Sequence, residues 1–321
     1  MLETAIATIN AFENNFSTAK AIEYTIDHAE IPVFAVSVYL AIVFYIPERL
    51  ALKPGYNLRT SWASWNLLLS GFSAIGMYRT VPYLAHHLIS EGFHFTTCED
   101  PRNWFLRYDE PNPVGFWVTL FIYSKIPELI DTIFLVFQKK PVIFLHWFHH
   151  VTVLLYCWHA FSNWTASGLW FVAMNFSVHS VMYFYYFLSI SGFKSLAKPL
   201  APLITSIQMI QMIVGCLVTY NTAVTKQNGG ECAVNSANYK LGLAMYGTYF
   251  GLFAVLFYNL YLKHGGKHNT PRVTRSGKKI NSSNGTTGNV AGAVICGVEI
   301  NDGDAAGFFH TKSKEERKKD L

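Results

Sequence analysis

Three histidines stand near the start of the apolar stretch 141–158, which reads PVIFLHWFHHVTVLLYCW. On a helix, the spacing of His146, His149 and His150 puts all three rings on one face. A neutral imidazole can attack an activated acyl group, and a neighbouring imidazole can orient it or move protons. Because a polar face is costly in lipid, we expect these rings to face a protein interior and to carry the chemistry.

Polar side chains at helical spacing also interrupt three other apolar stretches. In KIPELIDT, four polar side chains are predicted to fall on one helical face, where opposite charges can neutralise one another: Lys125, Glu128, Asp131 and Thr132. An ion pair that only holds helices together is the alternative, and it is strongest for Glu128. The stretches 166–190 and 200–220 each stack polar residues on one stripe: Asn175, His179, Tyr183 and Tyr186 in the first, and Thr205, Gln208 and Gln211 in the second.

A histidine cluster is also typical of metal sites. Membrane di-iron desaturases and hydroxylases use several histidine clusters, whereas this chain has one complete cluster and scattered other histidines. Three or four histidines suffice for one zinc ion, but each ligating ring usually needs an outer partner of its own. We therefore expect acid–base and nucleophilic chemistry with no bound metal or other cofactor. A metal-dependent lipid desaturase or hydroxylase is the alternative.

The elements that position these residues are predicted from composition. Of the 321 residues, 51% are hydrophobic and only 14% are charged, whereas about a quarter are charged in an ordinary soluble domain. With several apolar stretches about twenty residues long, the chain is predicted to be an all-α polytopic membrane protein, and nothing indicates a nucleic-acid partner. Seven transmembrane helices are predicted, at about 31–46, 62–84, 115–137, 142–161, 166–190, 200–220 and 241–262.

Basic residues set the predicted orientation of these spans. Lysines and arginines gather in the loops after the first, third and fifth spans and in the tail, and such loops face the cytosol. Residues 1–30 are then a lumenal segment and 31–263 the membrane domain. Residues 264–321 form a cytosolic tail, which is rich in Gly, Asn, Ser and Lys and is predicted to be disordered.

This orientation gives meaning to two cysteines and two short motifs. Cys98 and Cys232 both fall in non-cytosolic loops, where a disulfide can persist; two unpaired cysteines are the alternative. Asn15 begins a glycosylation sequon on the lumenal side. Lys318 and Lys319 have the spacing of a C-terminal dilysine address, which coat machinery reads for retrieval to the endoplasmic reticulum. A basic tail end without an address is the alternative.

A seven-span receptor is the non-enzyme alternative, because the span count and the orientation match. Against it, the third span ends in QKK at 138–140 rather than in the acidic-Arg-aromatic triplet of the common receptor class. The seventh span also lacks an NPxxY pattern, and the tail ends in the dilysine motif. We therefore favour an enzyme.

The motifs around the histidines resemble those of the ELO family of very-long-chain fatty acid elongases, over about 62–263. They read KIPELIDTIFLVFQKK, FLHWFHH, MNFSVHSVMYFYY and TSIQMIQMIVGC. The resemblance implies a 3-oxoacyl-CoA synthase of the endoplasmic reticulum, which joins long-chain acyl-CoA to malonyl-CoA and releases carbon dioxide and CoA. A separate ketoacyl reductase, dehydratase and enoyl reductase would complete the cycle. Trp147, among the histidines, is typical of the branch that elongates saturated and monounsaturated chains.

The resemblance also implies a fold and a set of roles. Six of the seven helices would form a barrel of two inverted three-helix units around an acyl tunnel. His149 would take the acyl group as an acyl-imidazole, and His179 would contact malonyl-CoA and steady its enolate. His146 and His150 would orient rings or relay protons, and Asp131 would fix an imidazole tautomer. The substrate-binding residues would be Lys125, Glu128, Asn175, Tyr183, Tyr186 and Gln208, while cytosolic Lys and Arg side chains would meet the CoA phosphates.

Three points stay open. Condensation in a ternary complex, with the histidines acting only as acids and bases, is the alternative to the acyl-imidazole. The preferred chain length depends on which side chains close the lumenal end of the tunnel. The sequence also leaves a homodimer open.

Overall fold

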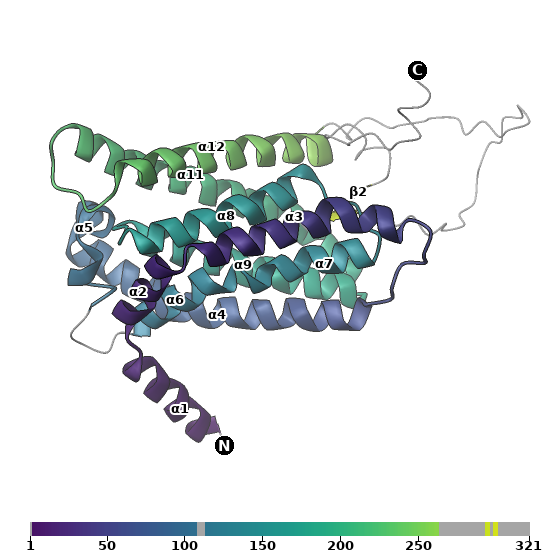
Figure 1. Ribbon diagram of the computed structural model, residues 1–321, viewed down its shortest axis with the longest axis horizontal. Helices are drawn as coiled ribbons and strands as arrows, with labels where there is room; N and C mark the ends of the chain where they lie inside the picture. The colour runs from purple at the N-terminus through teal and green to yellow at the C-terminus, as the bar shows by residue number, and fades with distance from the viewer. Residues whose placement is uncertain (1, 108–112, 263–292, 296–297, 301–321) are drawn as a thin grey trace, which may run out of the picture.

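The computed structural model describes residues 2–107, 113–262, 293–295 and 298–300, and its long helices lie side by side along one axis (Figure 1). Successive long helices are connected at alternating ends of this bundle, so they run in opposite directions (Figure 1). In chain order the long segments are α3 (Glu30–Leu50), α4 (Arg59–Ser90), α6 (Pro113–Ser124) continued by η2 (Pro127–Leu129) and α7 (Ile130–Phe137), α8 (Phe144–Ser162), α9 (Gly168–Ser191), α11 (Ala201–Gln227) and α12 (Ser236–Phe257).

Shorter elements lie at the two ends of the bundle. They are α1 (Leu2–Asn15), α2 (Thr18–Asp27), α5 (Gly92–Cys98), η1 (Pro101–Asn103), α10 (Lys194–Ala197), η3 (Lys198–Leu200) and the π-helical turn η4 (Tyr258–Leu262). α1 projects away from one end, and α2 connects it to the start of α3 (Figure 1). Ser17 accepts a hydrogen bond from Lys20 N at the start of α2, so the sequence Asn15-Phe16-Ser17 separates two helices. Asn15 is exposed there, and its glycosylation stays a prediction.

The long helices fit a chain that crosses a membrane several times. Within the described ranges, three helical segments are long and apolar enough for this by length and composition alone: Glu30–Leu50, Lys194–Gln227 and Ser236–Leu262. α4 and α9 are also long, but each buries polar side chains, such as Asn66 and His179. On α3 and α11, large apolar side chains such as Phe34 and Leu203 are exposed on the outside of the bundle, as expected for helices that face lipid. The number of seven spans stays a prediction.

The third predicted span is broken near its middle instead of forming one helix. Proline has no N–H and its ring clashes with the preceding turn, so Pro127 interrupts the regular helical bonding. The chain tightens just before it, where Lys125 N donates to Ile122 O three residues back. Glu128 then lies in η2 and Asp131 in α7. The predicted neutralisation of opposite charges is confirmed for Lys125 and Glu128, which form an ion pair. The prediction of one shared face on a single helix is wrong for Asp131, which bonds to Trp65 and Tyr183 instead.

One end of the bundle brings together three loops that carry basic side chains. Lys139 Nζ donates to Ala51 O across 2.9 Å, which joins the loop after α7 to the loop after α3. Arg59 Nε donates to Ile190 O across 2.6 Å, which joins the start of α4 to the end of α9. α9 stops at Gly192, whose φ of +106° favours glycine. We name this part of the molecule the basic end.

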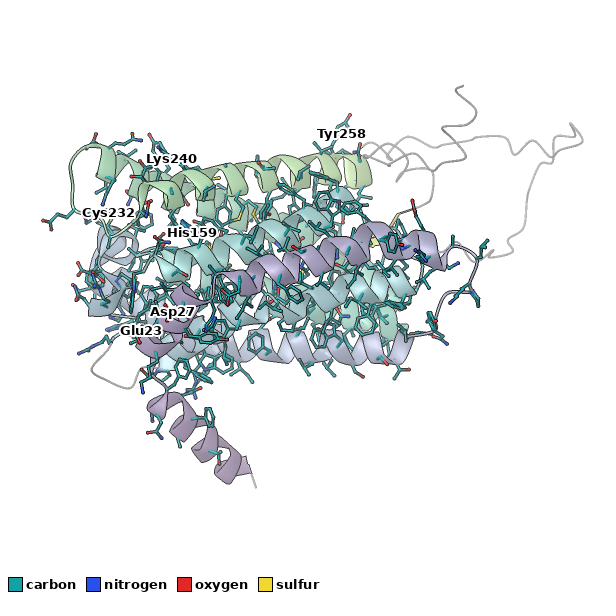
Figure 2. All side chains as sticks on the ribbon, viewed as in Figure 1. Glu23, Asp27, His159, Cys232, Lys240 and Tyr258 are labelled. Atoms are coloured by element: carbon teal, nitrogen blue, oxygen red, sulfur yellow. A yellow bond between two sulfur atoms is a disulfide. The ribbon has the colours of Figure 1, made fainter. Side chains whose placement is uncertain are left out.

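The opposite end contains a disulfide bond between Cys98 and Cys232, which ties α5 to the loop between α11 and α12. A backbone bond from Ala233 N to Cys98 O reinforces this link. Figure 2 places Cys232 at this end and Tyr258, just after α12, at the basic end. We name the part around Cys98 and Cys232 the disulfide end.

An aromatic cluster fills the bundle on the side of the disulfide end. Phe176 of α9 is 1% exposed and packs edge-on against Phe121 and Phe72. α4 approaches it so closely that a Cβ on Gly76 would lie 2.5 Å from its ring. Trp104 and Phe105, from the connection that follows η1, complete the contact and are almost fully buried. This packing fixes α4 against α9 and closes the interior at that end.

The structure describes one short hairpin in the tail, which the sequence predicts to be disordered. β1 (Ala293–Ile295) and β2 (Val298–Ile300) pair antiparallel, with Val294 opposite Glu299. Lys318 and Lys319, which carry the predicted dilysine address, lie outside the described residues.

Candidate active site

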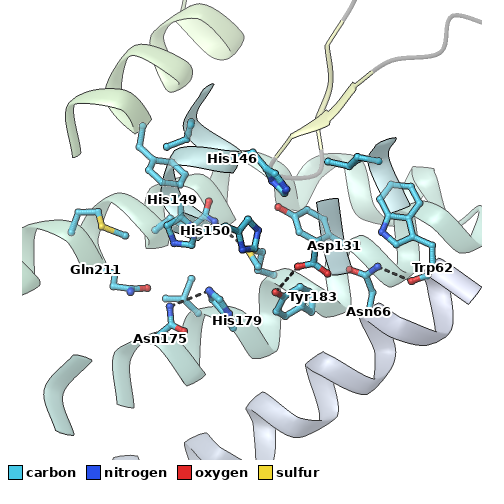
Figure 3. Close-up of a pocket in the computed structure, with 18 residues that line it drawn as sticks. Trp62, Asn66, Asp131, His146, His149, His150, Asn175, His179, Tyr183 and Gln211 are labelled. Carbon is cyan, nitrogen blue, oxygen red and sulfur yellow. Dashed lines mark hydrogen bonds between the residues drawn. The ribbon is translucent and has the colours of Figure 1, made fainter. Parts of the chain in front are cut away.

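A cavity inside the bundle contains all four histidines that the sequence predicts to be catalytic. We name it the polar cavity, and its walls come from α4, α7, α8, α9, α11 and α12 (Figure 3). The polar side chains that line it are Asn66, Asp131, His146, His149, His150, Asn175, His179, Tyr183, Tyr186, Gln208 and Gln211. Residues far apart in the sequence therefore meet in one space, as their predicted common role requires.

A second cavity, which we name the apolar cavity, continues the first towards the disulfide end. Its walls include Phe105, Leu106, Phe121, Phe161 and Gly168. Along α8, Phe161 follows His149 by about 18 Å at a rise of 1.5 Å per residue, so this cavity is deep. Four residues line both cavities: His149, Asn175, Gln211 and Met212.

His149 therefore stands at the junction of a polar and an apolar space. Its ring centre lies 5.2 Å from that of Tyr249 and 5.5 Å from that of His150. Tyr249 donates to the backbone oxygen of His149, not to its ring. Among the described residues, neither ring nitrogen of His149 has a hydrogen-bond partner. The imidazole is thus held by packing, while its lone pair is open to a ligand.

His146 is oriented by a hydroxyl pair on two other helices. Its Nε2 lies 2.8 Å from Thr132 Oγ1, which in turn lies 2.9 Å from the hydroxyl of Tyr39 on α3. The rings of His146 and His150 are 4.6 Å apart between centres. The sequence predicts that Asp131 orients an imidazole, but the structure places Thr132 beside the ring. Neighbouring residues on a helix point about 100° apart, so Asp131 faces other elements.

Asp131 accepts two hydrogen bonds from side chains of α4 and α9. Trp65 Nε1 donates to Oδ1 across 2.7 Å. Tyr183 donates to Oδ2 across 2.9 Å (Figure 3). Both donors aim at separate oxygens, which suits an ionised carboxylate with acceptors only. Trp65 carries no pattern that sequence reasoning picks out. Asn66, by contrast, is a polar residue inside an apolar stretch, the same signal that picked out Asn175.

Lys125 and Glu128 form a buried ion pair that also reaches α9. Lys125 Nζ lies 2.8 Å and 3.0 Å from the two carboxylate oxygens of Glu128 and donates to Asn175 Oδ1 across 3.1 Å. It also lies 4.1 Å from the centre of the Phe121 ring. On the other side of the amide, Asn175 Nδ2 is 3.0 Å from His179 Nε2. Lys125 and Glu128, which the sequence predicts to bind substrate, are thus occupied by protein partners.

The remaining predicted substrate residues line the polar cavity. Gln208 Nε2 donates to Met182 Sδ across 3.3 Å, and its buried Oε1 has no hydrogen-bond partner among the described residues. Tyr186 lies beside Tyr183, with ring centres 6.2 Å apart. A buried acceptor without a partner is costly, so Oε1 of Gln208 is the group in this wall with most to gain from a ligand that donates a hydrogen bond.

The positions of His, Cys, Asp and Glu side chains bear on whether the site could hold a metal ion. In the part of the chain that the structure describes, no three His, Cys, Asp or Glu side chains are arranged to hold a metal ion. His87 is near the disulfide end, where its Nδ1 lies 3.0 Å from Tyr83 O and its ring packs against Trp104. That no metal is bound stays an expectation from the sequence.

Comparison with known proteins finds one matching family model and several similar relatives. Residues 24–269 match the family model described as "ELO: GNS1/SUR4 family". "Fatty acid elongase 3" of Trypanosoma brucei brucei is 42% identical over 303 residues, which cover 87% of this chain and 99% of that protein. "Very long chain fatty acid elongase 4" of Trypanosoma cruzi is 47% identical over 239 residues, covering 74% and 82%. "Very long chain fatty acid elongase 6" of Drosophila melanogaster is 38% identical over 268 residues, covering 83% and 82%.

Proposed function

The chain belongs to the ELO (GNS1/SUR4) family and is a fatty acid elongase with 3-oxoacyl-CoA synthase activity, and from this premise we propose that it works through an acyl intermediate on His149. Membership of the family sets aside the seven-span receptor and the metal-dependent desaturase. Acyl-CoA and malonyl-CoA are the substrates of the family, whose members are multi-pass membrane proteins.

The observation that carries this proposal is the position of His149 at the junction of the two cavities. An acyl chain in the apolar cavity would bring its thioester carbon to the neck where that ring lies. With no protein partner on either nitrogen within the described ranges, the ring keeps its lone pair for attack. The apolar walls would bury the chain, which contributes about 0.8 kcal/mol per methylene.

The first half-reaction transfers the acyl group to the enzyme. A ring nitrogen of His149 attacks the thioester carbon, a C–N bond forms, and the C–S bond breaks with its electron pair leaving on sulfur. The proton lost from the acylated ring passes to the CoA thiolate, and CoASH departs. His146 and His150, whose rings adjoin, serve as the relay for that proton. Gln208 Oε1 would accept a hydrogen bond from an amide of the CoA arm.

The second half-reaction forms the carbon–carbon bond. The malonyl C–COO⁻ bond breaks, carbon dioxide leaves, and the electron pair becomes the enolate of the thioester. His179 donates a hydrogen bond to the enolate oxygen, where the negative charge develops. The enolate carbon attacks the acyl carbon, and the C–N bond to His149 breaks with its electron pair on the ring nitrogen. That nitrogen takes up one proton, delivered from solvent through His146 and His150, so neutral imidazole returns with 3-oxoacyl-CoA as the product. Overall, one proton is consumed as CoASH and carbon dioxide are released.

The proposed architecture has six helices around the tunnel and α3 outside it. Both cavities are lined by α8, α9, α11 and α12, with α4 and α7 at the polar one and α6 at the apolar one, and by no described residue of α3. This supports the barrel of two inverted three-helix units. The basic end would face the cytosol, where Lys140 lies over the Trp62 ring, 4.3 Å from its centre, beside the polar cavity. The CoA phosphates would meet the basic side chains there.

The setting of the enzyme follows from the same orientation. The proposed location is the endoplasmic reticulum membrane, with a lumenal N-terminus, a cytosolic C-terminus and glycosylation at Asn15. The dilysine motif at Lys318 and Lys319 would be read by coat machinery. A ketoacyl reductase, a dehydratase and an enoyl reductase would act on the product in turn. Saturated and monounsaturated acyl chains are the proposed substrates, on the basis of Trp147.

Intact mass measurement tests the covalent route. Purified enzyme incubated with acyl-CoA alone should gain the mass of one acyl group, and His149→Ala should gain none. His179→Ala should still be acylated but should form no 3-oxoacyl-CoA when malonyl-CoA is added. The exposed His94→Ala serves as the matched control and should behave as the wild type. An active wild-type enzyme that never shows the adduct would favour direct condensation in a ternary complex.

A further inference from the structure

We propose that Lys125 and Asn175 are positioning residues that fix the tautomer of His179, with the proton on Nδ1 and the lone pair on Nε2. The inference rests on the proposed function, in which His179 acts on the malonyl unit. It replaces the expectation that Lys125 and Asn175 hold the substrate themselves. Three pairs of buried side chains support it: Lys125 with Asn175, Asn175 with His179, and Lys125 with Glu128.

The first step is the orientation of the Asn175 amide. An ammonium group has three donors and no acceptor. Lys125 Nζ lies 3.1 Å from the amide of Asn175, so the atom that faces it must be the oxygen. The reversed amide would press its NH2 group against the ammonium, donor against donor. The Lys125 charge therefore determines which way the amide points.

The second step passes this choice to the imidazole. With Oδ1 on Lys125, the amide turns its NH2 group to His179, and Nδ2 lies 3.0 Å from Nε2. An N–H donor needs a lone pair opposite it, so Nε2 of the neutral ring is unprotonated and the proton resides on Nδ1. Asn175 and His179 are four residues apart on α9, so the helix itself holds the pair in register.

The third step explains why the ammonium keeps its charge inside the bundle. Lys125 and Glu128 are 2% and 4% exposed, and the carboxylate lies 2.8 Å and 3.0 Å from Nζ. The pair is neutral as a whole, and Ser124 donates a further bond to Glu128 across 2.9 Å. Removing either partner would leave an uncompensated buried charge, which is strongly destabilising.

The consequence is a division of labour between two histidines that line one cavity. Among the described residues, Nδ1 of His179 has no hydrogen-bond partner, so its N–H is offered to the cavity (Figure 3). His179 can then donate to an enolate oxygen but has no free lone pair with which to attack a carbonyl. His149 differs, because neither of its ring nitrogens is hydrogen-bonded by the described residues. Its lone pair is therefore free to attack a carbonyl carbon.

Nitrogen NMR of the full-length enzyme, labelled with ¹⁵N-histidine and held in detergent, tests the assignment. The His179 signals are identified by their loss in His179→Ala. In the wild type we expect a directly bonded proton on Nδ1 and none on Nε2. Asn175→Asp, which puts an acceptor in place of the amide NH2, should move the proton to Nε2. Asn175→Leu should give a mixture of both tautomers, and Ser177→Ala on the same helix should leave the wild-type pattern unchanged.

Variants of Lys125 test whether its charge determines the tautomer of His179 through Asn175. Lys125→Arg keeps a donor-only cation and should keep the proton on Nδ1, whereas Lys125→Met should lose that preference. Asn175→Leu should lower kcat for condensation by about tenfold or more with a smaller change in KM, as expected when a donor to the developing oxyanion is lost. A wild-type proton on Nε2, or an Asn175→Leu spectrum identical to the wild type, would overturn the proposal.

These readouts separate the inference from the covalent route. The tautomer is measured without substrate, so it stands or falls independently of an adduct on His149. If neither His149→Ala nor the wild type shows an adduct while Nδ1 of His179 carries the proton, the tautomer assignment holds and the acyl-imidazole proposal fails. If the adduct forms but the wild-type proton of His179 is on Nε2, the tautomer assignment is wrong and the acyl-imidazole proposal stands. Even if the Lys125 variants fail to fold, the wild-type spectrum decides the assignment.

Discussion

Tyr183 donates its hydroxyl proton to Asp131 across 2.9 Å and so joins α9 to α7 beside the catalytic histidines. Trp65 donates to the other oxygen of the same carboxylate across 2.7 Å, which adds α4 to the link. One side chain therefore holds three helices in register at the level of the polar cavity. We infer that Asp131 shapes the cavity by fixing these helices instead of touching an imidazole.

Asp131→Ala is expected to destabilise the enzyme more than Tyr183→Phe does. The alanine leaves the donors of buried Tyr183 and half-buried Trp65 without an acceptor, and for a buried donor the cost is about 1–3 kcal/mol. The phenylalanine removes one donor and leaves Trp65 bonded. Thermal unfolding in detergent, followed by tryptophan fluorescence, measures the difference in Tm. Equal Tm values for the two variants would show that Asp131 does not link the helices.

The closed end of the apolar cavity is expected to set the length of the acyl chain. Leu106→Ala removes a 2% exposed side chain from that wall, so we expect longer products, at a cost of about 2–5 kcal/mol in stability. Gly168→Leu should do the opposite, because its side chain would grow into the same space. Product lengths from an acyl-CoA series, read by mass spectrometry, test both. Leu155→Ala, on the outer face of α8, is the control and should change neither.

Loss of the disulfide is expected to loosen the same end of the molecule. Cys98→Ser with Cys232→Ser opens the link between α5 and the α11–α12 loop, and losing a native disulfide typically costs about 2–5 kcal/mol. The Tm should therefore fall well below that of Cys216→Ser, which removes a cysteine that forms no disulfide. A double variant as stable as the control would mean that the bridge contributes nothing measurable.

The loop beside the disulfide carries an acid-sensitive contact. Arg102 donates from Nε and from its backbone N to Asp100, and these bonds lower the pKa of the Asp100 carboxyl below its usual 3.8. Because the folded pKa lies below the unfolded one, the contact stabilises the fold above pH 3.8, and this is lost as the pH falls through the folded pKa. For such a surface pair we expect less than about 1 kcal/mol.

Asp100→Asn should therefore lower Tm slightly at pH 7, and the two proteins should converge as the solution is acidified below pH 3.8. Thermal scans across that range measure the difference. A gap between the two proteins that stays constant down to the lowest pH would mean that the carboxylate charge is not responsible.

The positions of most helices could be predicted from the sequence, because apolar runs and basic loops act locally. Residues of one stripe on a helix share a face whatever surrounds them, so the set His146, His149 and His150 could be singled out from its spacing alone. The same rule singled out Asn175 and His179. Their convergence with α11 in one cavity is a property of the fold, because it depends on how the helices are placed against one another.

Only the tertiary structure decided which of these polar groups touch one another. Pro127 breaks the third span, so Lys125 and Asp131 end in separate networks although they are six positions apart. Thr132, not its neighbour, reaches His146. Spacing along a helix determines where a side chain points around the axis of that helix. The partner that it meets depends on how the neighbouring helices are rotated and how closely they pack. That information resides in the packing of glycine, aromatic and proline residues on other segments, which no single stretch contains.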